Sequence, residues 1–205
     1  MRKRFFLTSA VLALTLGACS TPPPAPAAPT SMPATAAPDP YAGDPSVGPV
    51  DAPVVVIEYA NFECALCRQW QETQVYKGLT DEFGDQVRYV WRDYPIASLN
   101  SPLAAEAGQC ANAQGKFFEF ADVAVKLRGA LTEDTLKQLA AWLGLDTTQF
   151  NNCLGLGQFA SKVKQSWDEA KALQPFAPIW LVNGELVENA GPQTLVAAIN
   201  KALGK

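Results

Sequence analysis

The 205-residue chain contains no histidine, and this absence argues against several kinds of site. Structural zinc sites commonly combine cysteine with histidine or with a second cysteine pair at similar spacing, and the chain offers neither beside Cys64 and Cys67. Covalent haem attachment requires a histidine directly after the second cysteine, where Arg68 stands. A copper-delivery protein would usually offer histidine as well. We therefore expect no metal and no separate cofactor.

The chain also lacks basic clusters, and its formal net charge is −4. Proteins that bind nucleic acid usually gather lysine and arginine on one surface. The sequence shows no such cluster, so we do not expect nucleic acid as a partner. It shows no internal repeat either. Residues 51–205 are enough to bury a core, and we expect a single domain there.

A hydrophobic run long enough to cross a bilayer is missing, but a shorter one lies near the N-terminus. It extends over Phe5–Leu16 behind the basic segment Met1–Arg4, as in a secretory signal peptide. It ends in Leu16-Gly17-Ala18-Cys19, which resembles the bacterial lipobox, where the signal peptide is cut before the cysteine and the thiol is lipidated. We predict a lipoprotein signal peptide over residues 1–18 and a lipid on Cys19. An ordinary secretory signal is the alternative, and either one exports the protein.

Residues 19–50 have the composition of a tether rather than of a folded segment. Proline, alanine, serine and threonine dominate from Thr21 onward, and such chains are partly extended as polyproline II. With Cys19 lipidated, the tether would hold the folded part away from a bacterial membrane, on its periplasmic face or at the cell surface. Four cysteines then remain, an even number that suits the disulfide-permissive space outside the cytosol.

Cys64-Ala65-Leu66-Cys67 is the most informative motif because of its position. The apolar run over residues 54–57 predicts a buried strand before it, and the amphipathic stretch after it predicts a helix that begins at the cysteines. A thiol at a helix N-terminus meets unpaired N–H groups and the positive end of the helix dipole, and both favour the reactive thiolate. Two thiols one helical turn apart can also close into a disulfide. The motif predicts thiol–disulfide exchange, with a purely structural disulfide as the alternative.

The remaining pattern predicts a mixed α/β domain. Periodicity and turn signals place strands at 53–59, 86–91, 179–182 and 185–188. They place helices at 64–83, 103–113, 117–128, 133–143, 159–173 and 193–203. The order is therefore strand–helix–strand, then a helical block over about 100–173, then strand–strand–helix.

This order, with Cys-x-x-Cys at the first helix, resembles the thioredoxin fold with an inserted helical block. More closely, the chain resembles the DsbA-like family of bacterial thiol–disulfide oxidoreductases from about Asp51 to Leu203. The residues that carry the resemblance are Glu58, Phe62 and Arg68 around the cysteines, the segment Ala104–Phe117, and Pro178 followed by Ile179–Val182 and Asn183-Gly184. The chain departs from the family pattern at Ala65-Leu66 and at Phe176-Ala177, positions that tune the redox potential.

The motif and the resemblance together imply a role for each site residue. Cys64 would be the attacking thiol, and Cys67 would resolve the mixed disulfide. Glu58 matches the family's buried acid and would accept the Cys67 proton, unless it is a solvated carboxylate at the strand end. Pro178 matches the family's cis-proline, which faces the disulfide, although trans is the usual state of an X–Pro bond.

Two further cysteines, Cys110 and Cys153, both fall in the helical block. No second Cys-x-x-Cys unit exists, so we expect a structural disulfide between them, with two buried free thiols as the alternative. Closing a loop of that size would stabilise the fold by about 4 kcal/mol in the chain-entropy model.

These features predict a membrane-tethered oxidoreductase that introduces disulfides into exported proteins with cysteines and is recycled by a membrane redox partner. The cysteine pair itself would carry the electrons. We expect a monomer with a reduction potential of roughly −120 to −270 mV, between strongly oxidising and thioredoxin-like. The alternatives are a reductase or isomerase, and a binding lipoprotein that keeps the cysteine pair only for structure.

Overall fold

The computed structural model describes residues 38–127 and 129–205. The chain divides into two units after Ala37, and the second unit, Pro38–Lys205, is one compact body. The predicted signal peptide, Cys19 and the first part of the predicted tether lie outside the described residues. Within the described ranges, no helix is both long and apolar enough to span a bilayer.

The centre of the compact body is a five-stranded sheet in the order β1-β3-β2-β4-β5. β2 (Val54–Ala60) and β3 (Val87–Asp93) run parallel, and β4 (Ile179–Val182) pairs antiparallel with β2. β5 (Glu185–Leu186) forms a hairpin with β4. Both β2 and β3 are almost wholly buried, as expected of central strands that are covered on two faces. The α/β fold expected from the sequence is confirmed.

The folded part begins earlier than the expected boundary at Asp51. β1 (Ser46–Val47) pairs antiparallel with β3, and the segment before it is fixed by ion pairs. Asp39 contacts Arg88 at 2.9 Å, and Asp44 contacts Lys162 at 3.0 Å. A two-residue strand in a proline-rich segment carries too little periodicity to be recognised in a sequence.

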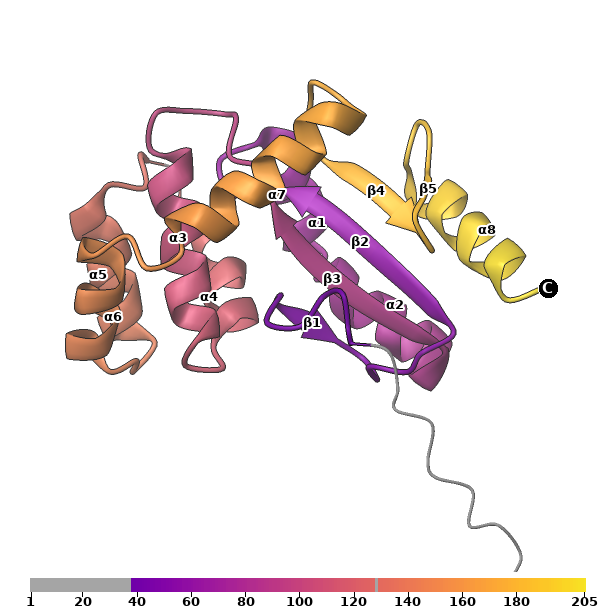
Figure 1. The fold of residues 1–205 in the computed structure, drawn as a ribbon, viewed down its shortest axis with the longest axis horizontal. Helices are drawn as coiled ribbons and strands as arrows, with labels where there is room; N and C mark the ends of the chain where they lie inside the picture. Colours follow the sequence, from indigo (N-terminus) through magenta and orange to yellow (C-terminus); the bar gives the residue numbers. More distant parts are fainter. Residues whose placement is uncertain (1–37, 128) are drawn as a thin grey trace, which may run out of the picture. The chain divides into compact units, whose positions relative to one another are not determined.

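The helix expected over 64–83 is in fact two helices, α1 (Ala65–Glu72) and α2 (Val75–Phe83). They are separated at Gln74, which has a left-handed φ of 52° that non-glycine residues adopt uncommonly. The Gln74 side-chain amide donates to Asp122 Oδ2 at 2.6 Å. Because Asp122 belongs to α4 (Phe117–Ala124), this bond fixes the break against the helical block. Figure 1 shows α1 and α2 behind the sheet.

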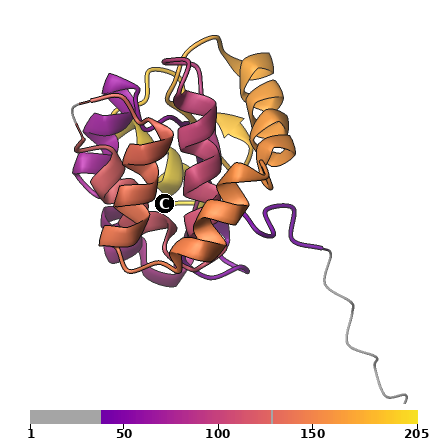
Figure 2. The ribbon, with the colours of Figure 1, turned by 90° about the vertical axis from the view of Figure 1, so that its left-hand side faces the viewer.

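The helical block lies between β3 and β4 in the sequence, as expected. Its other members are α3 (Ser101–Asn112), α5 (Glu133–Trp142), α6 (Thr147–Gly155) and α7 (Ala160–Leu173). Figures 1 and 2 show the block beside the sheet, with α7 returning in front of the face opposite α1 and α2. The other helices of the block were expected from the sequence, but α6 was not.

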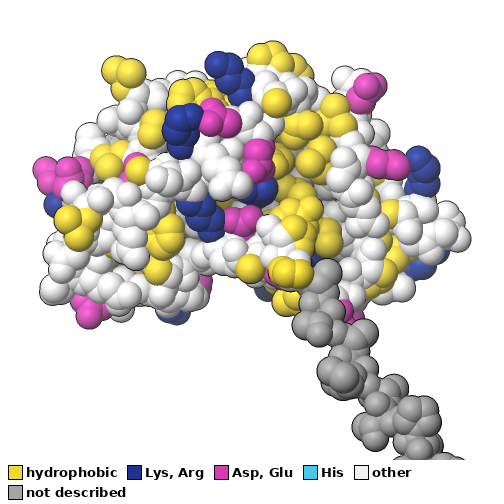
Figure 3. All heavy atoms as spheres, viewed as in Figure 1, with side chains coloured by type: hydrophobic (Ala, Val, Ile, Leu, Met, Phe, Trp, Pro, Cys, Tyr) yellow, Lys and Arg dark blue, Asp and Glu magenta, His cyan; other side chains and the backbone are white. Residues whose placement is uncertain are grey.

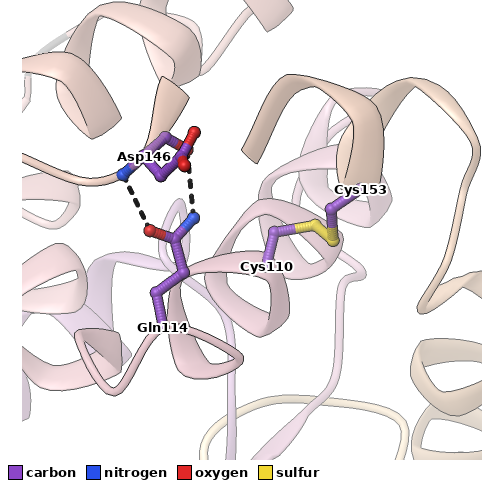
Figure 4. Close-up of a disulfide and its surroundings, with 4 residues drawn as sticks. All are labelled: Cys110, Gln114, Asp146 and Cys153. Carbon is purple, nitrogen blue, oxygen red and sulfur yellow. Dashed lines mark hydrogen bonds between the residues drawn. A yellow bond between two sulfur atoms is a disulfide. The ribbon is translucent and has the colours of Figure 1, made fainter. Parts of the chain in front are cut away.

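A disulfide joins Cys110 in α3 to Cys153 in α6, which is the expected pairing, and both residues are buried. Figure 4 shows a second link beside it, between Gln114 and Asp146. The Asp146 N–H donates to Gln114 Oε1 at 2.8 Å, and Gln114 Nε2 donates to the Asp146 carbonyl at 3.2 Å. Asp146 also caps α6 by accepting from the Gln149 N–H. The disulfide and the two Gln114–Asp146 hydrogen bonds hold α6 against α3, and the cap ties these hydrogen bonds to the first turn of α6.

The last helix, α8 (Pro192–Ala202), packs against β2 and β4 through the buried residues Leu195 and Ile199. Figure 3 shows the face of the molecule that carries α7. Acidic and basic side chains are interspersed on this face, with apolar side chains between them.

Candidate active site

The first cysteine of the motif is the N-cap residue of α1, so the predicted helix start at the cysteines is confirmed. Cys64 follows the short turn after β2, where its N–H donates to the Asn61 carbonyl at 3.2 Å. Cys64 Sγ accepts from the Cys67 N–H at 3.4 Å. Both cysteines are free thiols in the structure; Cys64 is partly exposed, and Cys67 is fully buried. Only Cys64 is therefore accessible to another protein.

The surroundings of Cys64 lower the pKa of its thiol to about 6. The largest cause is the hydrogen bond with the Cys67 side chain, and backbone hydrogen bonds at Cys67 and Leu66 and the charge of Arg68 act in the same direction. Arg68 is fixed by two backbone carbonyls, because Nε donates to Phe62 at 2.8 Å and Nη1 donates to Leu127 at 2.8 Å. At neutral pH Cys64 is mostly the nucleophilic thiolate.

Cys67 behaves in the opposite way. Burial raises the pKa of its thiol well above the ordinary value, and its hydrogen bond to Cys64 and the charges of Cys64 and Glu58 add to the effect. Cys67 therefore stays protonated at neutral pH. Any reaction at Cys67 therefore moves a proton to or from its sulfur, which solvent does not contact.

The loop before β4 brings a proline against the first cysteine. The Ala177–Pro178 peptide bond is cis. The Cys64 Sγ lies 3.5 Å from the Ala177 carbonyl oxygen, to which the thiol donates while it is protonated. The structure thus places the cis Ala177–Pro178 bond next to the reactive sulfur, through the Ala177 carbonyl.

Glu58, in β2, is fully buried rather than solvated at the strand end. Burial raises the pKa of its carboxyl to about 8, although two hydrogen bonds partly oppose the shift. Gln71 Nε2 donates to Glu58 Oε2 at 2.8 Å, and the Tyr89 hydroxyl donates to the same oxygen. Because Glu58 adds to the shift in the pKa of Cys67, the carboxyl and the buried thiol interact electrostatically. A carboxyl with a pKa of about 8 can give up or accept a proton close to neutral pH.

A groove of about 820 Å³ begins beside the cysteines and runs between α1, α2, the loop before β4 and α8. Its lining is largely apolar and includes Leu66, Trp70, Phe176, Pro178 and Val196. Leu66 and Phe176 are each 58% exposed, although both are large and apolar. The two positions that depart from the family pattern therefore supply apolar surface next to Cys64.

Two residues of this site were not predicted, Gln71 and Tyr89. Gln71 lies on α1 one turn after Cys67, and Tyr89 lies on β3, so only the folded chain brings them to Glu58. The spacing of four residues between Cys67 and Gln71 was the one available signal, because residues i and i+4 share a helix face. Nothing in the sequence distinguished Tyr89 from an ordinary core residue of a strand.

Comparisons with known proteins agree with this geometry. A family model described as thioredoxin matches residues 41–201. The probable disulfide bond formation protein D of Bacillus cereus is 32% identical over 177 residues, which cover 80% of this chain and 81% of that protein. A thioredoxin-like oxidoreductase from Silicibacter pomeroyi superposes with a TM-score of 0.70 at 27% identity, over 80% of this chain and 94% of that one.

The chain also matches Na⁺/H⁺ antiporter NhaA 3 of Salinispora tropica, with 35% identity over 153 residues. That match covers 73% of this chain but 23% of the antiporter, so the chain spans about a quarter of the length of such relatives. Three findings agree: the family model, the fold, and the relatives that are matched over most of their length. They show that the chain belongs to the DsbA-like thiol–disulfide oxidoreductases of the thioredoxin superfamily.

Proposed function

We propose that the protein is an extracytoplasmic oxidase that transfers the Cys64–Cys67 disulfide to cysteine pairs of exported proteins. The observation that carries this direction is the pKa of about 6 at Cys64. A stabilised thiolate favours the reduced form of the pair, and a pair that is stable when reduced is oxidising as a disulfide. No cofactor is needed, because the two sulfur atoms carry both electrons.

The reaction proceeds through a mixed disulfide. A client thiolate attacks Cys64 Sγ, the Cys64–Cys67 bond breaks, and Cys67 leaves as a thiolate that takes the Glu58 proton. A second client thiolate then attacks the client sulfur of the mixed disulfide, and Cys64 leaves as a stabilised thiolate. The client pair is oxidised by two electrons, and the Cys64–Cys67 pair is reduced by two. When a membrane redox partner reoxidises the pair, Glu58 accepts the Cys67 proton.

The groove beside Cys64 fits an extended, apolar segment of an unfolded client. Its apolar lining and the exposed side chains of Leu66 and Phe176 offer contacts that do not depend on one client sequence. The carbonyl of Ala177 faces the reactive sulfur, and when Cys64 carries no proton it can accept a hydrogen bond from the client backbone. These features favour catalysis over a purely structural role for the cysteine pair.

The lipobox-like sequence supports a location at the outer side of a bacterial membrane, with Cys19 as the lipid attachment site. We also propose that the folded part acts as a monomer. Lipid on Cys19 would keep the enzyme near a membrane redox partner.

Mass spectrometry of the mature protein is expected to show a chain that begins at a lipidated Cys19. An unmodified Cys19 thiol would contradict the anchor without affecting the proposed reaction.

Transfer of the disulfide to a client tests the proposed direction. The purified disulfide form is expected to oxidise a reduced, unfolded client with two cysteines, with one client disulfide formed for each Cys64–Cys67 disulfide consumed. Thiol counting on both proteins after acid quenching measures this exchange. If the disulfide form transfers nothing while the dithiol form reduces client disulfides, the protein is a reductase. If neither form reacts, the binding lipoprotein is the better description.

A further inference from the structure

The buried carboxyl of Glu58 is held asymmetrically. Tyr89 and Gln71 both donate to Oε2, and Gln71 Nε2 also lies 3.1 Å from the Tyr89 hydroxyl. Within the described residues, Glu58 Oε1 is buried and has no hydrogen-bond partner. The side chains of Glu58, Gln71 and Tyr89 are at most 1% exposed, so bulk water does not reach these hydrogen bonds. One carboxyl oxygen is occupied, and the other is available.

The groups that face Glu58 are neutral apart from the cysteine thiolate. From α1 and its N-cap these are Cys64, Cys67 and Gln71, and from β3 Tyr89. The cross-strand neighbours of Glu58 are Trp91 in β3 and Trp180 in β4. No ion pair involves Glu58 within the described residues. Neutral donors orient a carboxyl while stabilising its charge less than a cation would.

From this arrangement, and resting on the proposed function, we propose that Tyr89 and Gln71 are positioning residues that reserve Oε1 of Glu58 for the Cys67 proton. Gln71 stands one turn after Cys67 on α1, so it ties the carboxyl to the helix that carries the buried thiol. Tyr89 ties the same oxygen to β3. Burial raises the pKa of the Tyr89 hydroxyl well above its ordinary value, so it remains a donor over the working pH range.

The experiment isolates the step in which Cys67 loses its proton. Reduced full-length protein is mixed with excess oxidised glutathione in a stopped-flow instrument, and the unimolecular phase is followed at a series of pH values. In this phase Cys67 attacks Cys64 Sγ, glutathione leaves as a thiolate that solvent protonates, and Glu58 takes the Cys67 proton. In the wild type the rate constant is expected to rise with a midpoint set by the pKa of Glu58, at or below about pH 8, because the mixed disulfide removes the Cys64 charge that helps to raise that pKa.

Tyr89→Phe and Gln71→Met each remove one donor with little change in volume. Since each donor stabilises the carboxylate, its loss is expected to move the midpoint upward by about one pH unit, the size of a hydrogen bond to a charged group. Tyr94→Phe is the matched control, because Tyr94 is also a buried tyrosine, and its hydroxyl donates to the Gln174 carbonyl at 2.8 Å rather than to Glu58. The Tyr94→Phe midpoint is expected to equal that of the wild type.

Glu58→Gln is expected to remove the transition altogether. If it leaves the transition in place, or if Tyr89→Phe and Gln71→Met keep the wild-type midpoint, the proposal is wrong. An unchanged midpoint in one variant alone would overturn the role of that residue. Failure of the proposed function looks different, since the wild-type disulfide form would then transfer no disulfide to a reduced client at any pH, whatever the midpoint of the reaction with glutathione.

Discussion

Replacing Cys64 with serine should abolish thiol–disulfide exchange, and replacing Cys67 with serine should instead trap clients on the enzyme. Cys64 is the exposed thiolate that forms the mixed disulfide, so without it no client bond forms. Cys67 is the buried thiol that resolves this bond, so without it the bond persists. Non-reducing electrophoresis after incubation with a reduced client and a mild oxidant measures both results.

The double variant Cys64→Ser/Cys67→Ser is the control, because it should trap no client and transfer no disulfide. Adducts formed through Cys67 in the Cys64→Ser variant would show that the buried thiol is reachable and that the assigned roles are reversed. Equal amounts of adduct in Cys67→Ser and in wild type would show that Cys67 resolves nothing.

Removal of the second disulfide should cost stability without removing exchange. The bond closes a loop of 43 residues between α3 and α6, and the chain-entropy model gives about 4 kcal/mol for a loop of this length. The variant Cys110→Ala/Cys153→Ala should therefore lose about 4 kcal/mol of unfolding free energy in urea, while the Cys64 thiolate stays reactive. Denaturation followed by circular dichroism measures the loss.

The Gln114–Asp146 link provides a comparison for this effect. Gln114→Ala removes two neutral hydrogen bonds beside the disulfide and should cost about 1–2 kcal/mol, less than the covalent bond. Under mild reduction, the Cys64–Cys67 disulfide should open before the buried Cys110–Cys153 bond, because the active pair has the higher potential. The reverse order, or a loss of exchange in the double alanine variant, would show that Cys110 and Cys153 take part in the reaction.

The parts of the fold that were predicted are those with strong local patterns. Val54–Ile57 is apolar and β-branched, and the helix start at Cys64 follows from a short turn, so both could be placed from the sequence. The break at Gln74 had no signal, because a left-handed glutamine is stabilised by Asp122 from α4 rather than by a local glycine or proline. α6 was missed because threonine and asparagine, which are poor helix formers, occupy four of its nine positions.

The same division applies to the site. Cys64 and Cys67 are recognisable from spacing, and Glu58 and Pro178 from the family resemblance. Gln71 and Tyr89 could not be found in this way, because their role depends on contacts with Glu58 across 13 and 31 residues of sequence. The opposite pKa directions at Cys64 and Cys67 likewise come from burial, which a motif does not specify.

The central claim is that α1 holds Cys64 as a thiolate at neutral pH and keeps Cys67 protonated. The most direct measurement is a pH titration of the reduced protein by the ultraviolet absorbance of thiolate, with Cys64→Ser as the reference. We expect one ionisation with a midpoint near pH 6 that is absent from Cys64→Ser. A midpoint near the ordinary cysteine pKa of about 8.5, or an acidic ionisation that persists in Cys64→Ser, would contradict it.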